Sequence, residues 1–173
     1  YIEQAQENGA VAVAIDAQQA LKLDSSNLTV PIISVPNLKA IQGSMAARIN
    51  HQPSQHMSLI GITGTNGKTS CSQFIAQCLS DLGLTCGVVG TLGYGLLNAL
   101  ELGPNTTPDE VIMQSQLGAM LEAGALACAI EVSSHGLVQG RLNGCRFETA
   151  VFTNLTQDHL DYHGTMQAYG EVK

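Results

Sequence analysis

A glycine-rich segment at residues 64–69, Gly-Thr-Asn-Gly-Lys-Thr, has the residue types and spacing of a phosphate-binding loop. It follows an apolar run at 58–63, which predicts a strand, and it opens an amphipathic pattern over 68–82, which predicts a helix. In such a turn the backbone N–H groups face one point, and the helix N-terminus adds partial positive charge. Lys68 would add a full positive charge, and the Thr69 hydroxyl could hold Mg²⁺. The segment therefore predicts a site for a nucleoside triphosphate.

The match to the strict loop pattern G-x-x-x-x-G-K-S/T is incomplete, because Ile62 stands where the first glycine belongs. The segment is the shorter form G-x-x-G-K-T. A glycine-rich turn with Lys68 facing solvent is therefore an alternative. The strand before the turn and the helix after it favour phosphate binding, since such sites form where a strand end meets a helix N-terminus.

The carboxylate of Glu131, near the end of the apolar run 125–132, is a second group that could hold Mg²⁺. This run is continuous rather than alternating in polarity, which predicts a strand buried on both faces. In a parallel sheet its end would lie at the edge where ligands bind, and the polar residues 133–136 that follow favour a site there. The alternative is a surface charge on an edge strand.

Two histidines, His159 and His163, are four residues apart, so on a helix they would share a face and could bind zinc. The zinc motif H-E-x-x-H needs a glutamate after its first histidine, and Leu160 stands there, which disfavours a zinc hydrolase. A capped helix start with histidines on the surface fits the spacing equally well.

The elements that would position these residues alternate between strands and helices. The sequence predicts strands at 10–15, 31–35, 58–63, 86–90, 125–132 and 149–154, and helices at 38–49, 68–82 and 107–124. Thr107 is the expected N-cap of the last helix. This order predicts an α/β fold in which a doubly wound, mainly parallel sheet carries the phosphate loop, preceded by part of a small α/β domain. The polar segment 51–56 is the expected boundary, giving domains at 1–54 and 55–173.

The composition of the 173-residue chain limits its partners. It has 14 acidic and 7 basic side chains, a net charge of −7, and the scattered bases argue against a nucleic-acid or anionic-membrane binder. The hydrophobic fraction of 45% allows a core, and no apolar run approaches the roughly 18 to 20 residues that span a bilayer. The five cysteines include no C-x-x-C pair, which favours core thiols in a reducing cytoplasm over disulfides or a zinc cage.

Three strings in this sequence carry a resemblance to a known family: Gly64 to Thr69, Glu131 to Leu137 (Glu-Val-Ser-Ser-His-Gly-Leu) and Thr153 to Gly164 (Thr-Asn-Leu-Thr-Gln-Asp-His-Leu-Asp-Tyr-His-Gly). Together they resemble the Mur ligases of peptidoglycan synthesis. The resemblance covers nearly the whole chain and is strongest to the branch that adds the third residue to UDP-N-acetylmuramoyl-L-alanyl-D-glutamate. A folate-chain ligase of the same superfamily shares the phosphate loop but not the second and third strings.

The resemblance implies roles for individual residues. The ATP phosphates would be bound by Gly64, Thr65, Asn66, Gly67, Lys68, Thr69 and Ser70. Mg²⁺ would be held by Thr69, Glu131, His159 and Lys173, the last as a carbamate formed with CO₂. The UDP-muramoyl dipeptide would be contacted by Asn105, Thr106, Thr107, Ser133, Gln139 and Arg141. The catalytic residues would be Lys68, Glu131, His159 and Lys173, whereas His135 and Arg146 would be structural or peripheral.

The activity implied by the resemblance is ATP-dependent amide formation between the D-Glu carboxylate and a diamino acid, through an acyl phosphate. The expected diamino acid is meso-diaminopimelate rather than L-lysine, and the expected cofactors are ATP, Mg²⁺ and the carbamylated Lys173. The protein would be a cytoplasmic monomer with no nucleic-acid partner and no membrane insertion.

The chain starts without Met and ends with no helix stop signal, which predicts a piece of a longer enzyme. By the resemblance, residues 1–54 would be the C-terminal part of a UDP-substrate domain and 55–173 an incomplete ATP-binding central domain. The piece would be inactive alone, because the amino acid binds to a further, C-terminal domain. Two alternatives stay open: another P-loop kinase or ligase, and a non-catalytic nucleotide-binding module.

Overall fold

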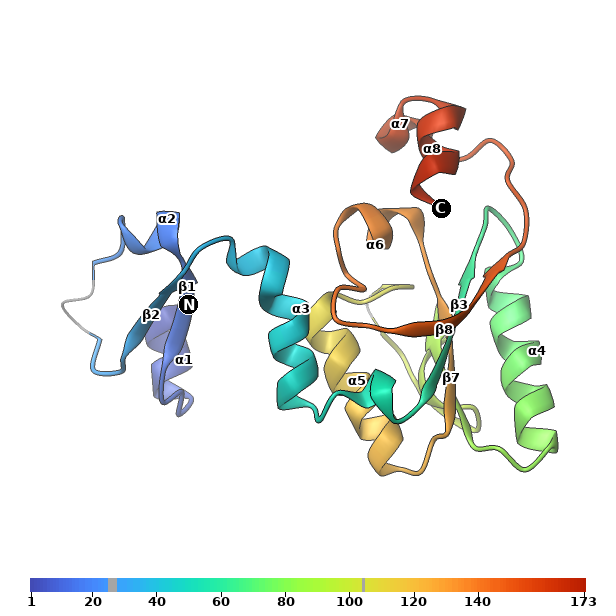
Figure 1. Cartoon of the computed structure of the whole chain (residues 1–173), viewed down its shortest axis with the longest axis horizontal. Helices are drawn as coiled ribbons and strands as arrows, with labels where there is room; N and C mark the ends of the chain where they lie inside the picture. The colour runs from blue at the N-terminus through green and yellow to red at the C-terminus, as the bar shows by residue number, and fades with distance from the viewer. Residues whose placement is uncertain (25–27, 104) are drawn as a thin grey trace. The chain divides into compact units, whose positions relative to one another are not determined.

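A computed structural model of the protein describes residues 1–24, 28–103 and 105–173 (Figure 1). The chain divides into two compact units, Tyr1–Gln42 and Gly43–Lys173. This division falls inside one helix, α3 (Leu38–Ile49). The boundary expected between residues 54 and 55 separates a UDP-substrate domain from an ATP-binding domain, and it stays a prediction.

The first unit contains a two-stranded parallel sheet. Its elements are α1 (Ile2–Glu7), β1 (Val13–Asp16), α2 (Ala17–Ala20), β2 (Ile32–Val35) and the start of α3. The pairing of β1 with β2 confirms the first two predicted strands. Asp16, at the end of β1, accepts hydrogen bonds from the backbone N–H groups of Gln18 (3.0 Å) and Leu38 (3.1 Å). One carboxylate therefore caps α2 and meets the first residue of α3.

The second unit contains a six-stranded sheet in the order β6-β5-β4-β7-β3-β8. Its strands are β3 (Ser58–Thr63), β4 (Cys86–Gly90), β5 (Gly93–Leu96), β6 (Ala99–Glu101), β7 (Ala127–Glu131) and β8 (Phe147–Phe152). Its helices, besides the rest of α3, are the 3₁₀ turn η1 (Pro53–Gln55), α4 (Lys68–Asp81), α5 (Glu110–Glu122), α6 (Ser134–Val138), α7 (Leu160–His163) and α8 (Met166–Val172). Strands β4, β7, β3 and β8 are parallel, and β5 and β6 extend the sheet as antiparallel strands.

The sheet is therefore mixed, and the sequence predicted only its parallel strands. Strands β5 and β6 were missed because β5 is rich in glycine, which lowers strand propensity. Gly93 and Gly95 have φ angles of 126° and 129°, and a Cβ at either position would lie within 2.7 Å of a backbone oxygen of β6. The glycines thus permit this antiparallel pairing, but they do not produce the alternation of side chains that predicts a strand.

Helices cover both faces of the sheet, α4 on one face and α5 on the other (Figure 1). The larger core cluster combines Met113, Leu117 and Met120 of α5 with strand residues that include Leu59, Val89 and Ile130. The smaller cluster combines Ala76 of α4 with Cys86, Val88 and Ala127. Neighbouring residues of β4 thus enter opposite cores, which explains its continuous apolar run. The continuous apolar run at 149–154 also predicted a strand buried on both faces, which is wrong, because β8 lies at the sheet edge and its residues are half-buried or exposed.

Helix α5 begins two residues later than its start signals predicted. Its N-cap is Asp109, whose carboxylate accepts hydrogen bonds from the N–H groups of Val111 and Ile112, both at 3.0 Å. Thr107 is instead buried, with its hydroxyl 2.8 Å from the carbonyl oxygen of Glu131. The prediction of Thr107 as the cap is wrong, because a carboxylate closer to the helix meets two of its unpaired N–H groups.

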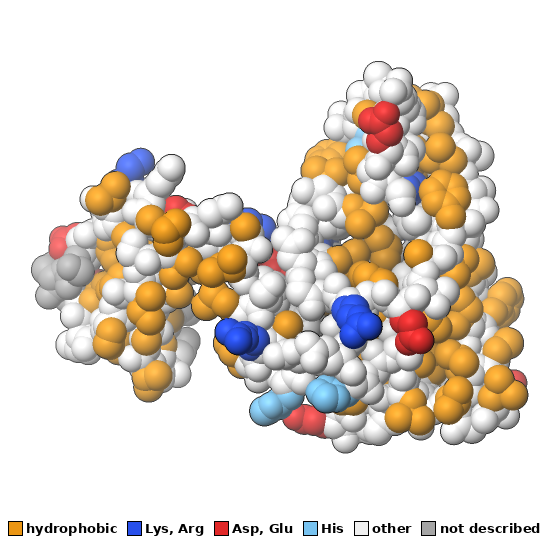
Figure 2. Space-filling view, viewed as in Figure 1, with side chains coloured by type: hydrophobic (Ala, Val, Ile, Leu, Met, Phe, Trp, Pro, Cys, Tyr) orange, Lys and Arg blue, Asp and Glu red, His pale blue; other side chains and the backbone are white. Residues whose placement is uncertain are grey.

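Three expectations from composition can be compared with the structure. The Lys and Arg side chains on the face drawn in Figure 2 form small, separate patches. Within the residues that the structure describes, no helix has the length and apolar character needed to cross a bilayer. Cys86 and Cys128 are buried core thiols, and burial raises the pKa of both, whereas Cys78 is exposed.

Candidate active site

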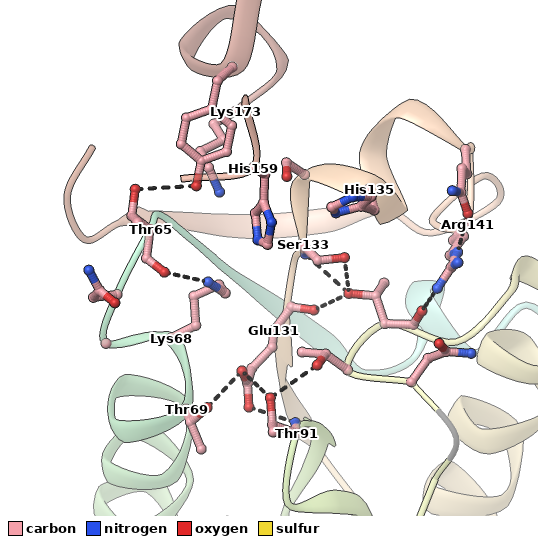
Figure 3. Close-up of a pocket in the computed structure, with 18 residues that line it drawn as sticks. Thr65, Lys68, Thr69, Thr91, Glu131, Ser133, His135, Arg141, His159 and Lys173 are labelled. Carbon is pink, nitrogen blue, oxygen red and sulfur yellow. Dashed lines mark hydrogen bonds between the residues drawn. The ribbon is translucent and has the colours of Figure 1, made fainter. Parts of the chain in front are cut away.

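A cavity of about 550 Å³ opens at the edge of the sheet where β3, β4 and β7 end (Figure 3). It is lined by all residues of the predicted site except Gly64 and Ser70. The remaining lining residues are Thr91, Ser134, His135 and Tyr169. The topology therefore brings segments that are far apart in the sequence to one place, as expected for the carboxyl edge of a parallel sheet.

Two of these lining residues, Thr91 and Tyr169, were not predicted, and His135 was treated as peripheral. Thr91 directly follows the strand predicted at 86–90, so the rule that ligands bind beyond strand ends could have found it. Tyr169 lies in the short helix α8 and carries no comparable signal in the sequence.

The phosphate loop between β3 and α4 is closed by its own lysine. The Lys68 Nζ donates a hydrogen bond to the Gly64 carbonyl (2.9 Å). It also donates to the Thr65 carbonyl (2.8 Å), as Figure 3 shows. Gly64 has a φ of 138°, and a Cβ there would lie 1.9 Å from the Thr153 Oγ1. That hydroxyl in turn donates to the Asn66 carbonyl at 2.7 Å. The loop therefore depends on glycine where the segment after β8 crosses it.

The segment after β8 also supports the loop through two reciprocal pairs. The Asn66 N–H donates to Asn154 Oδ1 (3.1 Å), and Asn154 Nδ2 donates to the Asn66 carbonyl (3.0 Å). The Thr65 hydroxyl donates to the Thr156 carbonyl (3.1 Å), and the Thr156 N–H donates back to Thr65 Oγ1 (3.0 Å). The first and third strings of the sequence thus form one structure.

Glu131 is 1% exposed and lies at the end of β7, near the middle of the sheet. Its Oε1 accepts the Thr91 N–H (2.9 Å), and its Oε2 accepts the hydroxyls of Thr69 (2.9 Å) and Thr91 (3.2 Å). The alternative of a surface charge on an edge strand is therefore wrong. Hydroxyl and carboxylate oxygens are the ligands that Mg²⁺ prefers, so Thr69 and Glu131 fit this ion.

The residues expected to contact the substrate hold one another in the opposite wall. The Arg141 guanidinium donates to the Thr107 carbonyl (2.7 Å) and to Gln139 Oε1 (2.9 Å). The Thr107 hydroxyl accepts the Ser133 N–H (3.1 Å), and the Ser133 hydroxyl caps α6 by accepting the Gly136 N–H (3.1 Å). Thr107 therefore supports this wall, while Arg141 and Gln139 line the cavity in a fixed relation.

Aromatic rings of the third string pack against His135 beside the cavity. The ring centroids of His135 and His159 are 4.8 Å apart, and those of His135 and Tyr162 are 4.2 Å apart. Burial, and then the nearby rings of His159 and His163, lower the pKa of His135 from 6.5. The His163 Nε2 lies 2.9 Å from Ser134 Oγ, whereas the ring of His159 packs against the ring of His135. Among the described residues no group of three or more Cys, His, Asp and Glu could hold a metal ion.

Lys173 reaches the phosphate loop from the end of α8. Its Nζ donates to the Gly64 carbonyl (2.8 Å) and lies 4.8 Å from the centroid of the Tyr169 ring. Burial, and then the positive charge of Lys68, lower the pKa of Lys173 from 10.5 to about 8. The Tyr169 hydroxyl lies 3.2 Å from Thr65 Oγ1, so α8 contacts the loop through two side chains.

An α/β sheet with a G-x-x-G-K-T loop and a buried carboxylate at its carboxyl edge defines a class of nucleotide-phosphate-binding domains. Residues 62–173 match the family described as the Mur ligase middle domain. The chain therefore belongs to the Mur ligase family, and the matched range includes every residue of the predicted site.

Known relatives match over the whole chain. The UDP-N-acetylmuramoyl-L-alanyl-D-glutamate-2,6-diaminopimelate ligase of Pseudomonas aeruginosa is 51% identical over 173 residues, which are 100% of this chain and 35% of the relative. The ligase of the same name from Coxiella burnetii is 49% identical over the same shares. A solved structure of a ligase of this name has a TM-score of 0.77 at 40% identity and covers 99% of this chain and 33% of its own. The chain thus spans about a third of the length of these relatives.

Proposed function

We propose that this chain is the ATP-binding segment of a ligase that joins meso-diaminopimelate to UDP-N-acetylmuramoyl-L-alanyl-D-glutamate. The observation that carries the proposal is the convergence of the phosphate loop, Glu131 and the Asn105–Thr107 segment on one cavity. Relatives with 49% and 51% identity carry the name of a 2,6-diaminopimelate ligase, which favours this diamino acid over L-lysine.

The loop from Gly64 to Ser70 would bind the phosphates of ATP, and Lys68 would place its ammonium among them. Thr69 and Glu131 would hold Mg²⁺, and His159 would hold a second ion together with the Glu131 carboxylate and a carbamylated Lys173. When bound, Mg²⁺ neutralises negative charge on the phosphate oxygens. Arg141, Gln139, Ser133 and the Asn105–Thr107 segment would bind and orient the UDP-muramoyl dipeptide.

The proposed reaction has two steps. The D-Glu carboxylate attacks the γ-phosphoryl group of ATP, which gives an acyl phosphate and ADP. The amine of the diamino acid then attacks the acyl carbon, forms the amide bond and releases inorganic phosphate and a proton. Both steps bring anions together, so charge stabilisation by Lys68 contributes more here than a general base would.

The carbamate at Lys173 would form from its neutral amine and CO₂ with release of one proton. A pKa lowered to about 8 supports this step, because it raises the fraction of neutral amine near neutral pH. The product is an anion beside the loop, so the modification would replace repulsion of Mg²⁺ by attraction.

The proposal includes the remaining expectations from the sequence. Residues 1–54 would complete a UDP-substrate domain, and 55–173 would form part of a doubly wound ATP-binding domain. The whole enzyme would be a cytoplasmic monomer, and this chain alone would not complete the ligation. The competing functions are another P-loop kinase or ligase and a non-catalytic nucleotide-binding module.

The test is ADP release by the full-length protein with ATP, Mg²⁺, the UDP-muramoyl dipeptide and meso-diaminopimelate. We expect release to require both substrates and Lys68→Ala to slow it at least about 100-fold, because the lysine stabilises transferred charge. Lys22→Ala, at an exposed lysine of the first unit, is the matched control and should retain activity. ADP release that does not depend on the UDP-muramoyl dipeptide would instead favour the kinase alternative.

A further inference from the structure

The turn after β4 places Thr91 against the carboxylate of Glu131. Thr91 makes two contacts with it, from its N–H to Oε1 (2.9 Å) and from its hydroxyl to Oε2 (3.2 Å). Figure 3 shows Thr91 and Thr69 approaching the Glu131 carboxylate from different elements. Both oxygens of the carboxylate thus accept a hydrogen bond from one residue that the predicted site did not include.

The residue before Thr91 makes room for this arrangement. A Cβ at Gly90 would lie 2.1 Å from the Glu131 Oε1 and 2.6 Å from its Cδ. The carboxylate therefore lies directly against the end of β4, where it can reach the Thr91 N–H. The Gly90-Thr91 pair fixes one orientation of the Glu131 side chain.

The donors and acceptors among Thr106, Thr91 and Glu131 can be assigned. A carboxylate only accepts hydrogen bonds, so the Thr91 hydroxyl must donate its single hydrogen to Glu131. The Thr106 hydroxyl lies 3.1 Å from the Thr91 Oγ1 and must then be the donor of that contact. A directed chain runs from Thr106 through Thr91 to Glu131, and it leaves the lone pairs of Thr106 facing the cavity free to accept a hydrogen bond.

Thr91 also differs from Thr69 in what a metal ion would do to it. The Thr69 hydroxyl has two lone pairs and one hydrogen, so it could bind Mg²⁺ through a lone pair and still donate to Glu131. Both hydrogen bonds that Thr91 donates go to the carboxylate, so Thr91 would hold Glu131 without contacting the ion. Partners of this kind orient a metal ligand and tune its affinity without touching the metal.

We propose that Thr91 is a positioning residue that orients Glu131 for the cation and couples cation binding to ligand binding at Thr106. This inference rests on the proposed function and names a residue and a coupling that it does not contain. The group that binds at Thr106 is a hydrogen-bond donor, such as a hydroxyl or an amide N–H, because an acceptor would compete with Thr91 for the Thr106 hydrogen. Ligand binding that keeps this chain intact also keeps Glu131 in position.

The experiment compares Thr91→Val and Thr91→Ser in the full-length protein. Mn²⁺ replaces Mg²⁺, and its dissociation constant in the presence of ATP is measured by electron paramagnetic resonance, with and without the UDP-muramoyl dipeptide. We expect Thr91→Val to weaken Mn²⁺ binding about 10-fold or more, as loss of such partners does, and Thr91→Ser to restore it. The dipeptide should tighten Mn²⁺ binding in the wild type and in Thr91→Ser but not in Thr91→Val.

The matched control is Thr85→Val, the same change at an exposed threonine just before β4, which should bind Mn²⁺ as the wild type does. If thermal unfolding shows that Thr91→Val is destabilised, Thr91→Ala repeats the comparison without either γ-methyl group of valine. Wild-type Mn²⁺ affinity in folded Thr91→Val or Thr91→Ala would overturn this inference alone. Absence of Mn²⁺ binding by the wild type with ATP would overturn the proposed function and this inference with it.

Discussion

The two sides of the cavity are held in place by different means. On the side of the sheet, the loop and Glu131 lie at the ends of β3 and β7. Backbone groups meet both, since the Thr65 N–H donates to the Asn154 carbonyl and the Thr91 N–H donates to Glu131. On the other side, residues 158–173 include two short helices, α7 and α8. The loop is contacted there by the side chains of Tyr169, in α8, and of Lys173, which directly follows α8. His159 even starts α7 with a left-handed φ of 51°.

This difference indicates which side is preorganised. Backbone geometry at strand ends cannot change without disturbing the sheet, so the phosphate loop and Glu131 should keep their positions before ligands bind. Contacts through long side chains can rearrange by rotamer changes alone. We therefore expect substitutions on the sheet side to destabilise the fold or abolish ligand binding. Substitutions on the side of α7 and α8 should change the pKa and reactivity of individual side chains by smaller amounts.

The largest effect should come from Gly64→Ala in the phosphate loop. The φ of 138° lies where residues other than glycine are strained by about 1–3 kcal/mol, and the new methyl group would also displace Thr153. The matched control is Gly83→Ala, at φ 82° with nothing within 4 Å of the added Cβ, which should cost about 1 kcal/mol. Urea denaturation measures both, and equal losses would contradict a special role of the loop crossing.

The contrast between the two sides also explains what the sequence could predict. The strand, loop and helix around Lys68 are contiguous, so periodicity and turn composition were sufficient for them. Glu131 followed from the rule for strand ends in parallel sheets. The β5–β6 pair could not be predicted, because its glycines allow two backbones to approach closely and create no side-chain pattern.

The contacts of residues 158–173 could not be derived from local pattern at all. Tyr169 meets Thr65 across 104 positions of the chain, and Lys173 meets Gly64 across 109. Nothing in the spacing of His159 and His163 indicated that His135 would pack between the third string and the cavity wall. On this side the family resemblance indicated His159 and Lys173, and only the three-dimensional arrangement shows their partners.

A smaller effect is expected in the reactivity of Lys173. Its pKa of about 8 means that the neutral amine predominates above that pH, whereas an ordinary lysine stays protonated to 10.5. Between these values the unfolded chain binds more protons, so the free energy of unfolding should rise with pH in this window. At pH 8 a much larger fraction of Lys173 is neutral, so an acylating reagent should label it at least about tenfold faster than the exposed Lys22.

Added bicarbonate tests whether the carbamate forms. It should slow the labelling of Lys173, because the carbamate occupies the amine, and leave Lys22 unchanged. Mass spectrometry of the labelled peptides measures both rates in one sample. Labelling of Lys173 that is insensitive to bicarbonate would contradict the carbamate and leave the lysine as a plain cation at the loop.

The smallest effect is expected at His135, in the wall that meets the third string. Burial first, and then His159 and His163, hold its pKa below 6.5. The unfolded chain therefore takes up this proton at a higher pH than the folded one, and the contribution of His135 to stability is lost as the pH falls through 6.5 and below. An NMR titration should show a midpoint below 6.5.

His159→Gln removes one neighbouring positive charge, so the His135 midpoint should rise, yet it should stay below 6.5 because burial is the larger cause. The matched control is His56→Gln, at an exposed histidine that does not line the cavity, which should leave the midpoint unchanged. If His159→Gln left the titration midpoint of His135 unchanged, the charge of His159 would not affect the cavity wall. The side of α7 and α8 would then be as fixed as the side of the sheet, and the distinction between the two would rest on the Lys173 result alone.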